Sequence, residues 1–352
     1  MPSKEVLGVG IAGAGWVATQ YVPAFEKNPH TKVVAIMSRR MTSCESLAKS
    51  YGLSDVKLYT DYTKLIEDPN VDIVVICSPQ HVHAEQAVLA AEARKHMIVE
   101  KPIAINLDQL KAIRDAVRRT RVKTVVGFVL RWNPLFETIK SLLAEDALGD
   151  VYYIETGYNS HIAEWWSGWS WAKTKEYGVS SFLVAGVHAI DAARWLSCKQ
   201  RDKANNIVEV FAYAGGYRYR TEDIGYYGLE VMLTKFENGA IGKINSNFDC
   251  VNPYYFPISI FGNKGTVINN RVWASNKFPG QTDWVTIPTI LPDTADVRHH
   301  PFEYEVNHFV ECILKDKESH CNVEDAVNTH EAALAAIISY TDNRPVKLPL
   351  VK

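Results

Sequence analysis

The chain has 352 residues, of which 47% are hydrophobic and 22% charged, the composition of a folded globular protein. This length predicts two domains, because it exceeds what a single hydrophobic core normally serves. The formal net charge of −2 argues against a nucleic-acid-binding surface, which needs a local excess of Lys and Arg. No apolar run reaches the ~18 residues of a membrane span, and no export signal precedes the first apolar run. We therefore expect a cytoplasmic protein that binds neither nucleic acid nor membrane.

The six cysteines are scattered along the chain, and none forms a Cys-x-x-Cys pair. Isolated thiols are typical of a reducing compartment and predict neither a disulfide framework nor a zinc-thiolate site. The adjacent histidines His299 and His300 precede a helical stretch, and we interpret them as a loop and helix cap. No metal site is expected.

Up to about residue 125, short apolar runs alternate with helical patterns, which is typical of parallel βαβ units. The nearly continuous apolar character of residues 71–77 indicates a strand buried on both faces. The apolar runs lie at residues 7–12, 32–38, 71–77, 97–99 and 123–129, and helical spacing is found at 84–95 and 107–120. We therefore predict an α/β domain with a parallel sheet over residues 1–128.

After Arg131 the pattern changes to one typical of a different architecture. Alternating apolar and polar residues, punctuated by turns, indicate mostly antiparallel strands between residues 207 and 286. Helices are predicted at residues 135–147, 182–196, 302–315 and 324–342, and a strand at 151–158. This pattern predicts a second α/β domain, residues 129–352, built on a largely antiparallel sheet.

A glycine-rich turn follows the first apolar run directly, in the pattern G-x-G-x-x-A. Gly13 permits the tight turn from strand to helix, and Gly15 lets the backbone approach a pyrophosphate. The helix that follows offers free N–H groups to the phosphates, so Trp16 and Val17 are assigned to the same site. The position of the turn between a strand and a helix predicts a Rossmann domain that binds NAD(H) or NADP(H).

The residues at the end of the second apolar run bear on the choice of cofactor. Ser38, Arg39 and Arg40 stand where an NAD-specific site usually carries Asp or Glu to bind the ribose 2′-hydroxyl. An arginine here can meet a 2′-phosphate, which favours NADP. Two arginines at a helix start are also typical of an ordinary solvated surface, so both cofactors stay open.

Two further motifs follow apolar runs of the first domain, and a third lies in the second domain. In an open parallel sheet, ligands bind at the carboxyl ends of the strands. The first two motifs should therefore face the cofactor bound at Gly13, and the third contributes a histidine, His188. The residues concerned are Ser78, Pro79 and His83 after the apolar run at 71–77, Glu100 and Lys101 in a Glu-Lys-Pro after the run at 97–99, and His188 in the segment 185–191.

This set of motifs resembles the Gfo/Idh/MocA family of oxidoreductases, named for glucose–fructose oxidoreductase and inositol dehydrogenase. The likeness covers essentially the whole chain, including residues 127–134 and 345–349. It implies a Rossmann domain, a second α/β domain with a large open sheet that often forms the oligomer interface, and a sugar, inositol or glycoside substrate. The family's catalytic lysine and histidine fall on Lys101 and His188. Residues 180–188 resemble a subgroup of bacterial glycoside 3-dehydrogenases.

The chemistry of these two residues agrees with such a role. Oxidation of a secondary alcohol requires a base for the hydroxyl proton while hydride leaves for the nicotinamide. A buried lysine has a lowered pKa, and histidine titrates near neutrality unaided. The alternatives are a surface lysine before a proline and a core histidine on an apolar helix. The residues do not rank Lys101 against His188 as the base.

The chain departs from the family pattern at two positions. Val184 stands where the family's Asp-x-Gly-x-His has its aspartate, so no carboxylate at that position can orient His188. Arg94 stands where the family commonly has a glycine at a helix end. If the backbone there is left-handed, the non-glycine residue costs about 1 kcal/mol.

An aromatic segment between Asn159 and Trp171 predicts part of a substrate pocket. Four tryptophans fall within seven residues, and indole faces stack well on pyranose rings; ordinary core packing is the alternative explanation. Arg131 and Trp171 are assigned to the cofactor site. The substrate site is predicted to contain Lys101, Trp132, Asn159, Trp165, Trp169 and His188.

These features favour a dehydrogenase that oxidises a sugar or glycoside hydroxyl to a ketone. One alternative is a redox-neutral glycosidase that uses tightly held NAD; relatives of that kind tend to carry export signals. Another is a non-catalytic nucleotide-sensing regulator, but such proteins tend to lose the lysine that is present here as Lys101. We also expect a homo-oligomer formed through the sheet of the second domain.

Overall fold

The computed structural model describes residues 6–221, 223–292 and 300–352. The chain forms two compact units: unit 1 comprises the residues up to Gly127 together with Phe302–Val327, and unit 2 comprises Phe128–Pro301 and Asn328–Lys352. We expected Phe302–Val327 in the second domain. It lies in unit 1 because helix α9 (Phe302–Leu314) packs against helix α1 (Ala18–Lys27), with Asn28 Nδ2 donating to Asn307 Oδ1 at 2.7 Å.

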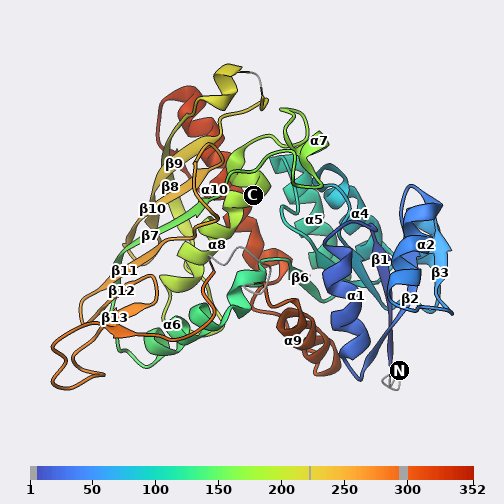
Figure 1. Ribbon diagram of the computed structural model, residues 1–352, viewed down its shortest axis with the longest axis horizontal. Coiled ribbons are helices and arrows are strands. Elements are labelled where there is room, and N and C mark those ends of the chain that lie inside the picture. The colour runs from blue at the N-terminus through green and yellow to red at the C-terminus, as the bar shows by residue number, and fades with distance from the viewer. Residues whose placement is uncertain (1–5, 222, 293–299) are drawn as a thin grey trace. The chain divides into compact units, whose positions relative to one another are not determined.

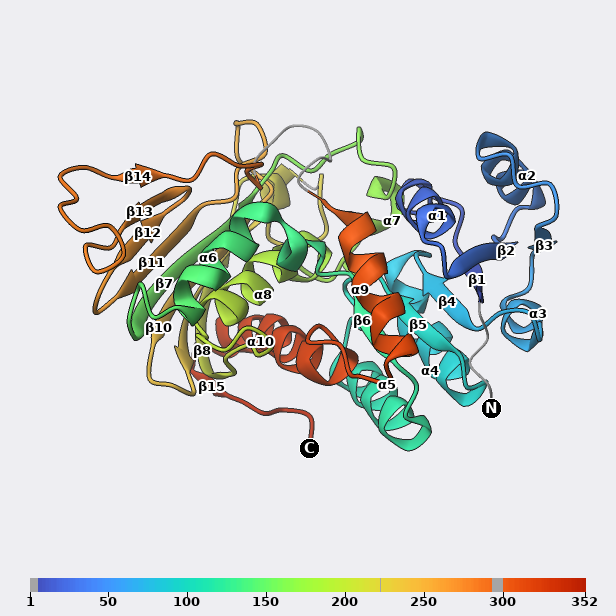
Figure 2. The same ribbon diagram turned by 90° about the horizontal axis from the view of Figure 1, so that it is seen from below.

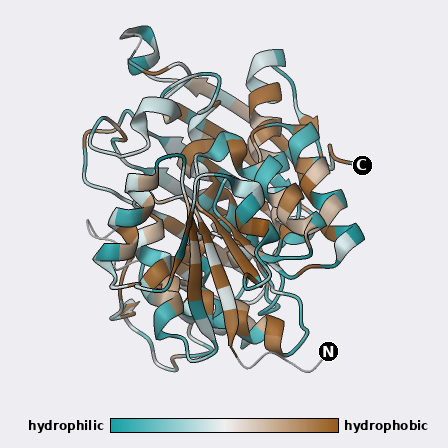
Figure 3. Ribbon diagram, turned by 90° about the vertical axis from the view of Figure 1, so that its right-hand side faces the viewer, coloured by the Kyte–Doolittle hydropathy of each residue, from teal (hydrophilic) through white to brown (hydrophobic). Residues whose placement is uncertain are grey.

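Unit 1 is built on a six-stranded parallel sheet in the order β3-β2-β1-β4-β5-β6 (Figure 1). The order reverses direction between β1 and β4, which is where a doubly wound sheet binds its ligand. Every residue of β1 and β4 is buried, and the sheet's strands are coloured largely hydrophobic in Figure 3. The predicted Rossmann fold is confirmed. The strands are β1 (Leu7–Ala12), β2 (Thr31–Met37), β3 (Lys57–Tyr59), β4 (Ile73–Ile76), β5 (His96–Val99) and β6 (Thr124–Val126).

The helices of unit 1 follow from their sequences. In α5 (Leu107–Thr120), the Asn106 side chain accepts a hydrogen bond from the Gln109 N–H and caps the helix start. Two residues after the end of α4 (His83–Glu92), Arg94 has a φ of 59°, the left-handed conformation in which a non-glycine residue is strained. Its guanidinium donates to the Thr120 carbonyl at 2.7 Å, which offsets part of the strain. The remaining helices are α2 (Met41–Ser50), α3 (Tyr62–Glu67), the 3₁₀ turn η1 (Gln80–Val82) and α4 (His83–Glu92).

Unit 2 contains a nine-stranded sheet in the order β14-β13-β12-β11-β7-β10-β9-β8-β15. Among the described residues, β7 and β10 pair in parallel and the other neighbouring strands pair antiparallel, so the mostly antiparallel sheet predicted from the sequence is confirmed. The strands are β7 (Val151–Asn159), β8 (Ile207–Gly215), β9 (Leu229–Phe236), β10 (Ile241–Asn247), β11 (Ile258–Gly262), β12 (Thr266–Ile268), β13 (Arg271–Trp273), β14 (Val285–Thr286) and β15 (Val346–Lys347).

The two faces of this sheet differ. Helices α6 (Pro134–Ala144), α8 (Val187–Leu196) and the unit 2 part of α10 (Val323–Asp342) lie on one face, as Figures 1 and 2 show. Strand residues alternate accordingly, with Met232 buried and the adjacent Leu233 52% exposed. Within the described residues, no helix covers the other face.

In the described part of the chain, no helix combines the length and the apolar character that crossing a bilayer requires.

Candidate active site

The glycine turn lies between β1 and α1, at the carboxyl edge of the unit 1 sheet. Gly13 has a φ of +113°, and a Cβ atom there would lie 2.6 Å from the Cys77 carbonyl oxygen, so only glycine fits. A Cβ at Gly15 would meet nothing within 4 Å. The turn is therefore closed on its sheet side at Gly13 and open at Gly15.

The start of α1 is suited to an anion. Its N-cap residue, Val17, provides no side-chain cap, and the first turn contains no acidic residue. Trp16, beside it, is 42% exposed. The N–H groups and positive dipole end of a helix with such a start are suited to a phosphate. Gly13, Gly15 and α1 thus fit the pyrophosphate of a dinucleotide.

The carboxyl ends of β2, β4 and β5 lie at the same edge of the unit 1 sheet as the glycine turn. Arg39 and Arg40 are exposed after β2, with Ser38 half-buried before them. After β4, the Ser78 hydroxyl donates to Gln86 Oε1 at 2.5 Å, and the half-buried Pro79 caps η1.

His83 connects two of these strand ends. Its Nδ1 lies 2.8 Å from the Pro102 carbonyl oxygen and its Nε2 lies 2.7 Å from that of Ser78. The ring is buried, and burial lowers the pKa of His83. His83 therefore connects the loops that follow β4 and β5. A direct contact between His83 and the cofactor stays a prediction.

Lys101 follows β5 and is half-buried. Burial lowers the pKa of its ammonium group, and the charge of the neighbouring Glu100 acts in the opposite direction. Glu100 is buried and its Oε2 accepts a hydrogen bond from the Lys101 backbone N–H at 3.2 Å. A lysine in this setting can lose its proton closer to neutral pH than a solvated one.

His188 is the second residue of α8, which directly continues a single turn of π-helix, η3 (Phe182–Gly186). The imidazole is buried within unit 2. Tyr158 is stacked on it with ring centroids 6.4 Å apart, and His300 is stacked at 6.1 Å. His299 lies outside the described residues. Single π-turns are frequent at functional sites, which agrees with a role for this histidine.

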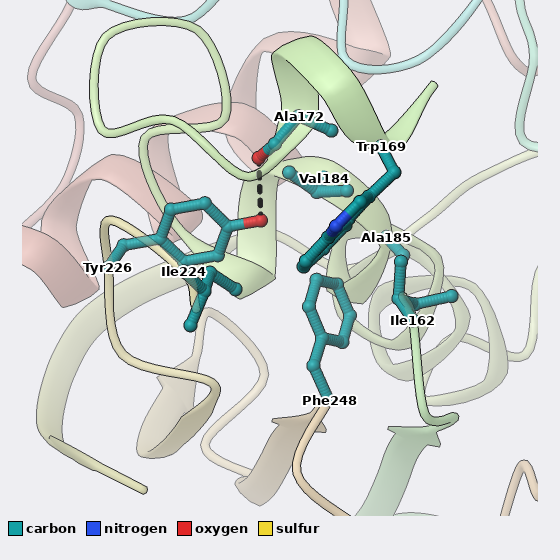
Figure 4. Packing of buried hydrophobic residues seen from close by; sticks show 8 residues of the cluster. All are labelled: Ile162, Trp169, Ala172, Val184, Ala185, Ile224, Tyr226 and Phe248. Carbon is teal, nitrogen blue, oxygen red and sulfur yellow. Dashed lines mark hydrogen bonds between the residues drawn. The ribbon is translucent and has the colours of Figure 1, made fainter. Parts of the chain in front are cut away.

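Val184 belongs to an apolar cluster. It is buried and packs in one group with Trp169, Tyr226 and Phe248 (Figure 4). A carboxylate placed there would be buried among apolar side chains at a cost of several kcal/mol. The apolar surroundings of position 184 therefore fit a valine better than the aspartate of the family pattern.

The aromatic segment divides into buried and exposed side chains. Trp169 is buried, and the guanidinium carbon of Arg218 lies 5.1 Å from its ring centroid. Trp171 is partly buried against the same cluster, whereas Trp165 is 66% exposed and donates to the His161 carbonyl at 2.7 Å. Core packing thus explains Trp169, and Trp165 has the exposed face that sugar stacking needs.

Two other assigned residues, Asn159 and Arg131, have clear partners in unit 2. Asn159 Oδ1 accepts from Asn245 Nδ2 at 2.8 Å, and Trp132 is buried. Arg131 forms a buried bidentate pair with Asp191, with Nε and Nη2 at 2.7 and 2.5 Å from the two carboxylate oxygens. This ion pair is a structural role for Arg131 that sequence reasoning missed.

The structure therefore places Gly13, Gly15, Ser78 and Lys101 at one edge of the unit 1 sheet. His188 and the tryptophans lie in unit 2, and their approach to Lys101 stays a prediction. Sequence motifs gave no indication of two buried residues that contact the Lys101 neighbourhood, Tyr21 and Glu305, described below.

A Rossmann sheet with this turn, and with a lysine of lowered pKa at the same edge, is the arrangement of a nicotinamide-dependent oxidoreductase. Residues 7–128 match the family model of the oxidoreductase family with an NAD-binding Rossmann fold, and residues 136–268 match the GFO/IDH/MocA C-terminal domain. The chain belongs to the Gfo/Idh/MocA family.

Curated relatives and solved structures agree with this assignment. The uncharacterised oxidoreductase YrbE of Bacillus subtilis is 28% identical over 98% of this chain and 97% of its own length. The NAD⁺-dependent scyllo-inositol 2-dehydrogenase of the same organism is 25% identical over 91% and 90%. Levoglucosan dehydrogenase of Pseudarthrobacter phenanthrenivorans is 28% identical over 75% and 73%.

A structure of a levoglucosan dehydrogenase with NADH and levoglucosan has the same fold, with a TM-score of 0.84 over 97% of this chain and 99% of that one at 22% identity. The protein is thus an NAD-binding oxidoreductase with sugar and polyol dehydrogenases among its relatives.

Proposed function

We propose that the protein oxidises a secondary hydroxyl of a sugar or glycoside, such as the C3 hydroxyl of a glucoside, to a ketone. The observation that carries this proposal is the half-buried Lys101, whose pKa is lowered by burial and which follows β5 at the edge where the glycine turn lies. The inositol and levoglucosan dehydrogenases among the relatives support a polyhydroxylated substrate.

The chain's own residues supply binding and proton transfer. Gly13, Gly15 and the start of α1 would hold the dinucleotide, whose nicotinamide supplies a hydride acceptor when bound. The substrate O–H proton passes to Lys101 or His188 as the carbon–hydrogen bond loses its hydride, so one proton and one hydride leave the alcohol. If Lys101 is the base, its neutral form accepts the proton, and turnover should then rise as pH increases through the Lys101 pKa.

The substrate contacts follow from what the side chains offer. Trp165 is exposed and can stack on a pyranose face, and the half-buried Asn159 can contact a hydroxyl. We assign Trp169 to the wall behind them, since it is packed in the apolar cluster.

We also propose that the protein forms an oligomer of identical chains through the uncovered face of the unit 2 sheet. Leu233 and Tyr213 are 52% and 66% exposed, in neighbouring strands β9 and β8. A second copy would remove this apolar surface from water. Sedimentation velocity measures the resulting mass, and a monomer at micromolar concentration would contradict the proposal.

The function is tested by incubating the purified protein with NAD⁺ or NADP⁺ and a panel of inositols, free sugars and glycosides. We expect growth of the absorbance of the reduced nicotinamide with at least one glycoside or sugar and none with simple secondary alcohols. Mass spectrometry of the denatured protein detects cofactor retained through purification. Loss of signal across the whole panel, with no retained cofactor, would contradict the proposal.

The exposed Arg39 gives a prediction about the cofactor. If its guanidinium meets a 2′-phosphate, Arg39→Ala should weaken NADPH binding by about 10-fold or more while changing NADH binding less than about 2-fold. Titration of intrinsic tryptophan fluorescence measures both dissociation constants. Arg121→Ala, at an exposed arginine after α5, is the matched control. Equal losses for the two cofactors would show that Arg39 does not contact a 2′-phosphate.

A further inference from the structure

Three buried ionisable side chains form a row that ends beside Lys101. Tyr21 on α1 donates its hydroxyl hydrogen to Glu100 Oε1, with the oxygens 2.8 Å apart. The same phenol oxygen lies 3.3 Å from Oε2 of Glu305 on α9. Tyr21 and Glu305 are completely buried, and Glu100 is 8% exposed. All three belong to unit 1.

Two arrangements of protons satisfy both contacts, with the acid proton either on Glu305 or on Glu100, and the contact lengths and neighbours of the two carboxyl groups favour the proton on Glu305. A phenol has one hydrogen, and the shorter contact assigns it to Glu100. The longer contact is then satisfied when Glu305 carries a proton and donates it to the Tyr21 oxygen. The other oxygen of Glu305, Oε1, has no hydrogen-bond partner among the described residues, which an ionised carboxylate would tolerate poorly. Burial and the Glu100 charge accordingly raise the pKa of Glu305 well above its ordinary value.

Glu100 is the member of the row that keeps the negative charge. Burial raises the pKa of Glu100, and the Lys101 charge and the hydrogen bonds from the Tyr21 hydroxyl and the Lys101 N–H act against that rise by favouring the carboxylate. Packing holds it in this place, because a Cβ atom on Gly127 would lie 2.7 Å from Glu100 Oε1.

The other ionisable groups around the row do not supply a competing charge. Burial raises the pKa of the Cys77 thiol and lowers the pKa of His83, so burial disfavours a charge on either group. Burial also raises the pKa of the Tyr21 phenol. The charge that acts on Lys101 from this row is therefore that of Glu100.

We propose that Tyr21 and Glu305 are positioning residues that keep Glu100 ionised and thereby set the pH range in which Lys101 accepts a proton. Glu305 donates to Tyr21, Tyr21 donates to Glu100, and the Glu100 carboxylate stabilises the Lys101 ammonium group. The inference rests on the proposed role of Lys101 as a base. It adds the two residues, distant in sequence, that tune that base.

The decisive variant is Tyr21→Phe. It removes the phenol that stabilises the Glu100 carboxylate, so the buried carboxyl takes up a proton and Lys101 loses its negative neighbour. Loss of a nearby opposite charge should lower the titration midpoint of Lys101 by about one pH unit. The rise of turnover with pH should move to lower pH by the same amount.

The midpoint is measured without turnover, by NMR of the full chain carrying lysine labelled with ¹³C at Cε, with Lys101→Met used to assign the signal. Tyr62→Phe is the matched control, since Tyr62 also donates a phenol hydrogen bond in unit 1, but to a backbone carbonyl, that of Gln86 at 2.7 Å, and not to a carboxylate. It should leave the Lys101 midpoint unchanged. Glu305→Gln should do the same, because the amide still donates to Tyr21.

Each outcome decides the inference. An unchanged Lys101 midpoint in Tyr21→Phe, or a shift in Glu305→Gln, would overturn it. If Tyr21→Phe does not fold, Glu305→Leu replaces it: removing the donor to Tyr21 should shift the midpoint in the same direction, and no shift would overturn the inference. The two proposals can fail separately. If the NMR midpoint of Lys101 moves in Tyr21→Phe but the pH dependence of turnover stays the same, the proposed role of Lys101 as the base is wrong and the inference about Tyr21 and Glu305 stands.

Discussion

Replacement of Lys101 by alanine is expected to lower turnover by about 10²- to 10⁴-fold, the usual contribution of a positioned general base. The physical reason is the local setting: Lys101 is half-buried beside Glu100, and burial lowers its pKa. The dissociation constant for the nicotinamide cofactor should change little, because the glycine turn at Gly13 and α1 bind the phosphates. Steady-state kinetics on the best substrate of the sugar panel, with fluorescence titration of the cofactor, measure both quantities.

Two further variants help to interpret a loss of turnover in Lys101→Ala. Lys57→Ala removes an exposed lysine of the same unit that pairs with Asp68, and it should retain full activity. His188→Asn, measured in parallel, shows how the proton transfer is divided between the two units. Undiminished turnover in Lys101→Ala would remove Lys101 from the chemistry, whereas a large loss only in His188→Asn would make the histidine the base.

The fold could be predicted from the sequence because its strands are encoded locally. Residues 7–12 contain no polar side chain and residues 71–77 only that of Asp72, and the structure buries β1 and β4 on both faces. Alternation along residues 207–286 likewise matches strands with one covered face. The placement of Phe302–Val327 in unit 1 could not be predicted, because it depends on contacts between α9 and α1 that are far apart in the chain.

The candidate site could be predicted where a short sequence motif requires a particular residue type. Gly13 shows this, since its φ and its closeness to Cys77 require glycine. Partners distant in sequence gave no local signal: the contact between Tyr21 and Glu305 spans 284 positions. Trp169 shows a second limit of prediction from sequence. A tryptophan can pack in a hydrophobic core or stack on a sugar, and only the burial of Trp169 in the structure assigns it to the core.

A second large effect is expected from the buried ion pair of unit 2. Arg131→Met should lower the free energy of unfolding by about 3–5 kcal/mol, because it leaves the Asp191 carboxylate buried without its cation. The two side chains are only 1% and 3% exposed, and Arg131 also lies over the Trp195 ring at 4.8 Å. Urea unfolding measures the loss. Arg271→Met removes an exposed arginine that lies over Trp284, and it should cost less than about 1 kcal/mol.

The same measurement separates the structural role of Arg131 from the cofactor contact predicted from the sequence. A ligand that binds only the folded protein stabilises it by RT ln(1 + [L]/Kd), so saturating cofactor should raise the unfolding free energy of any variant that still binds it. If Arg131 serves only Asp191, this increment should be the same in Arg131→Met as in the unmodified protein. If Arg131 also binds the cofactor, the increment should shrink. A small loss of stability without cofactor would instead contradict the ion pair as a main support of unit 2, whatever the cofactor does.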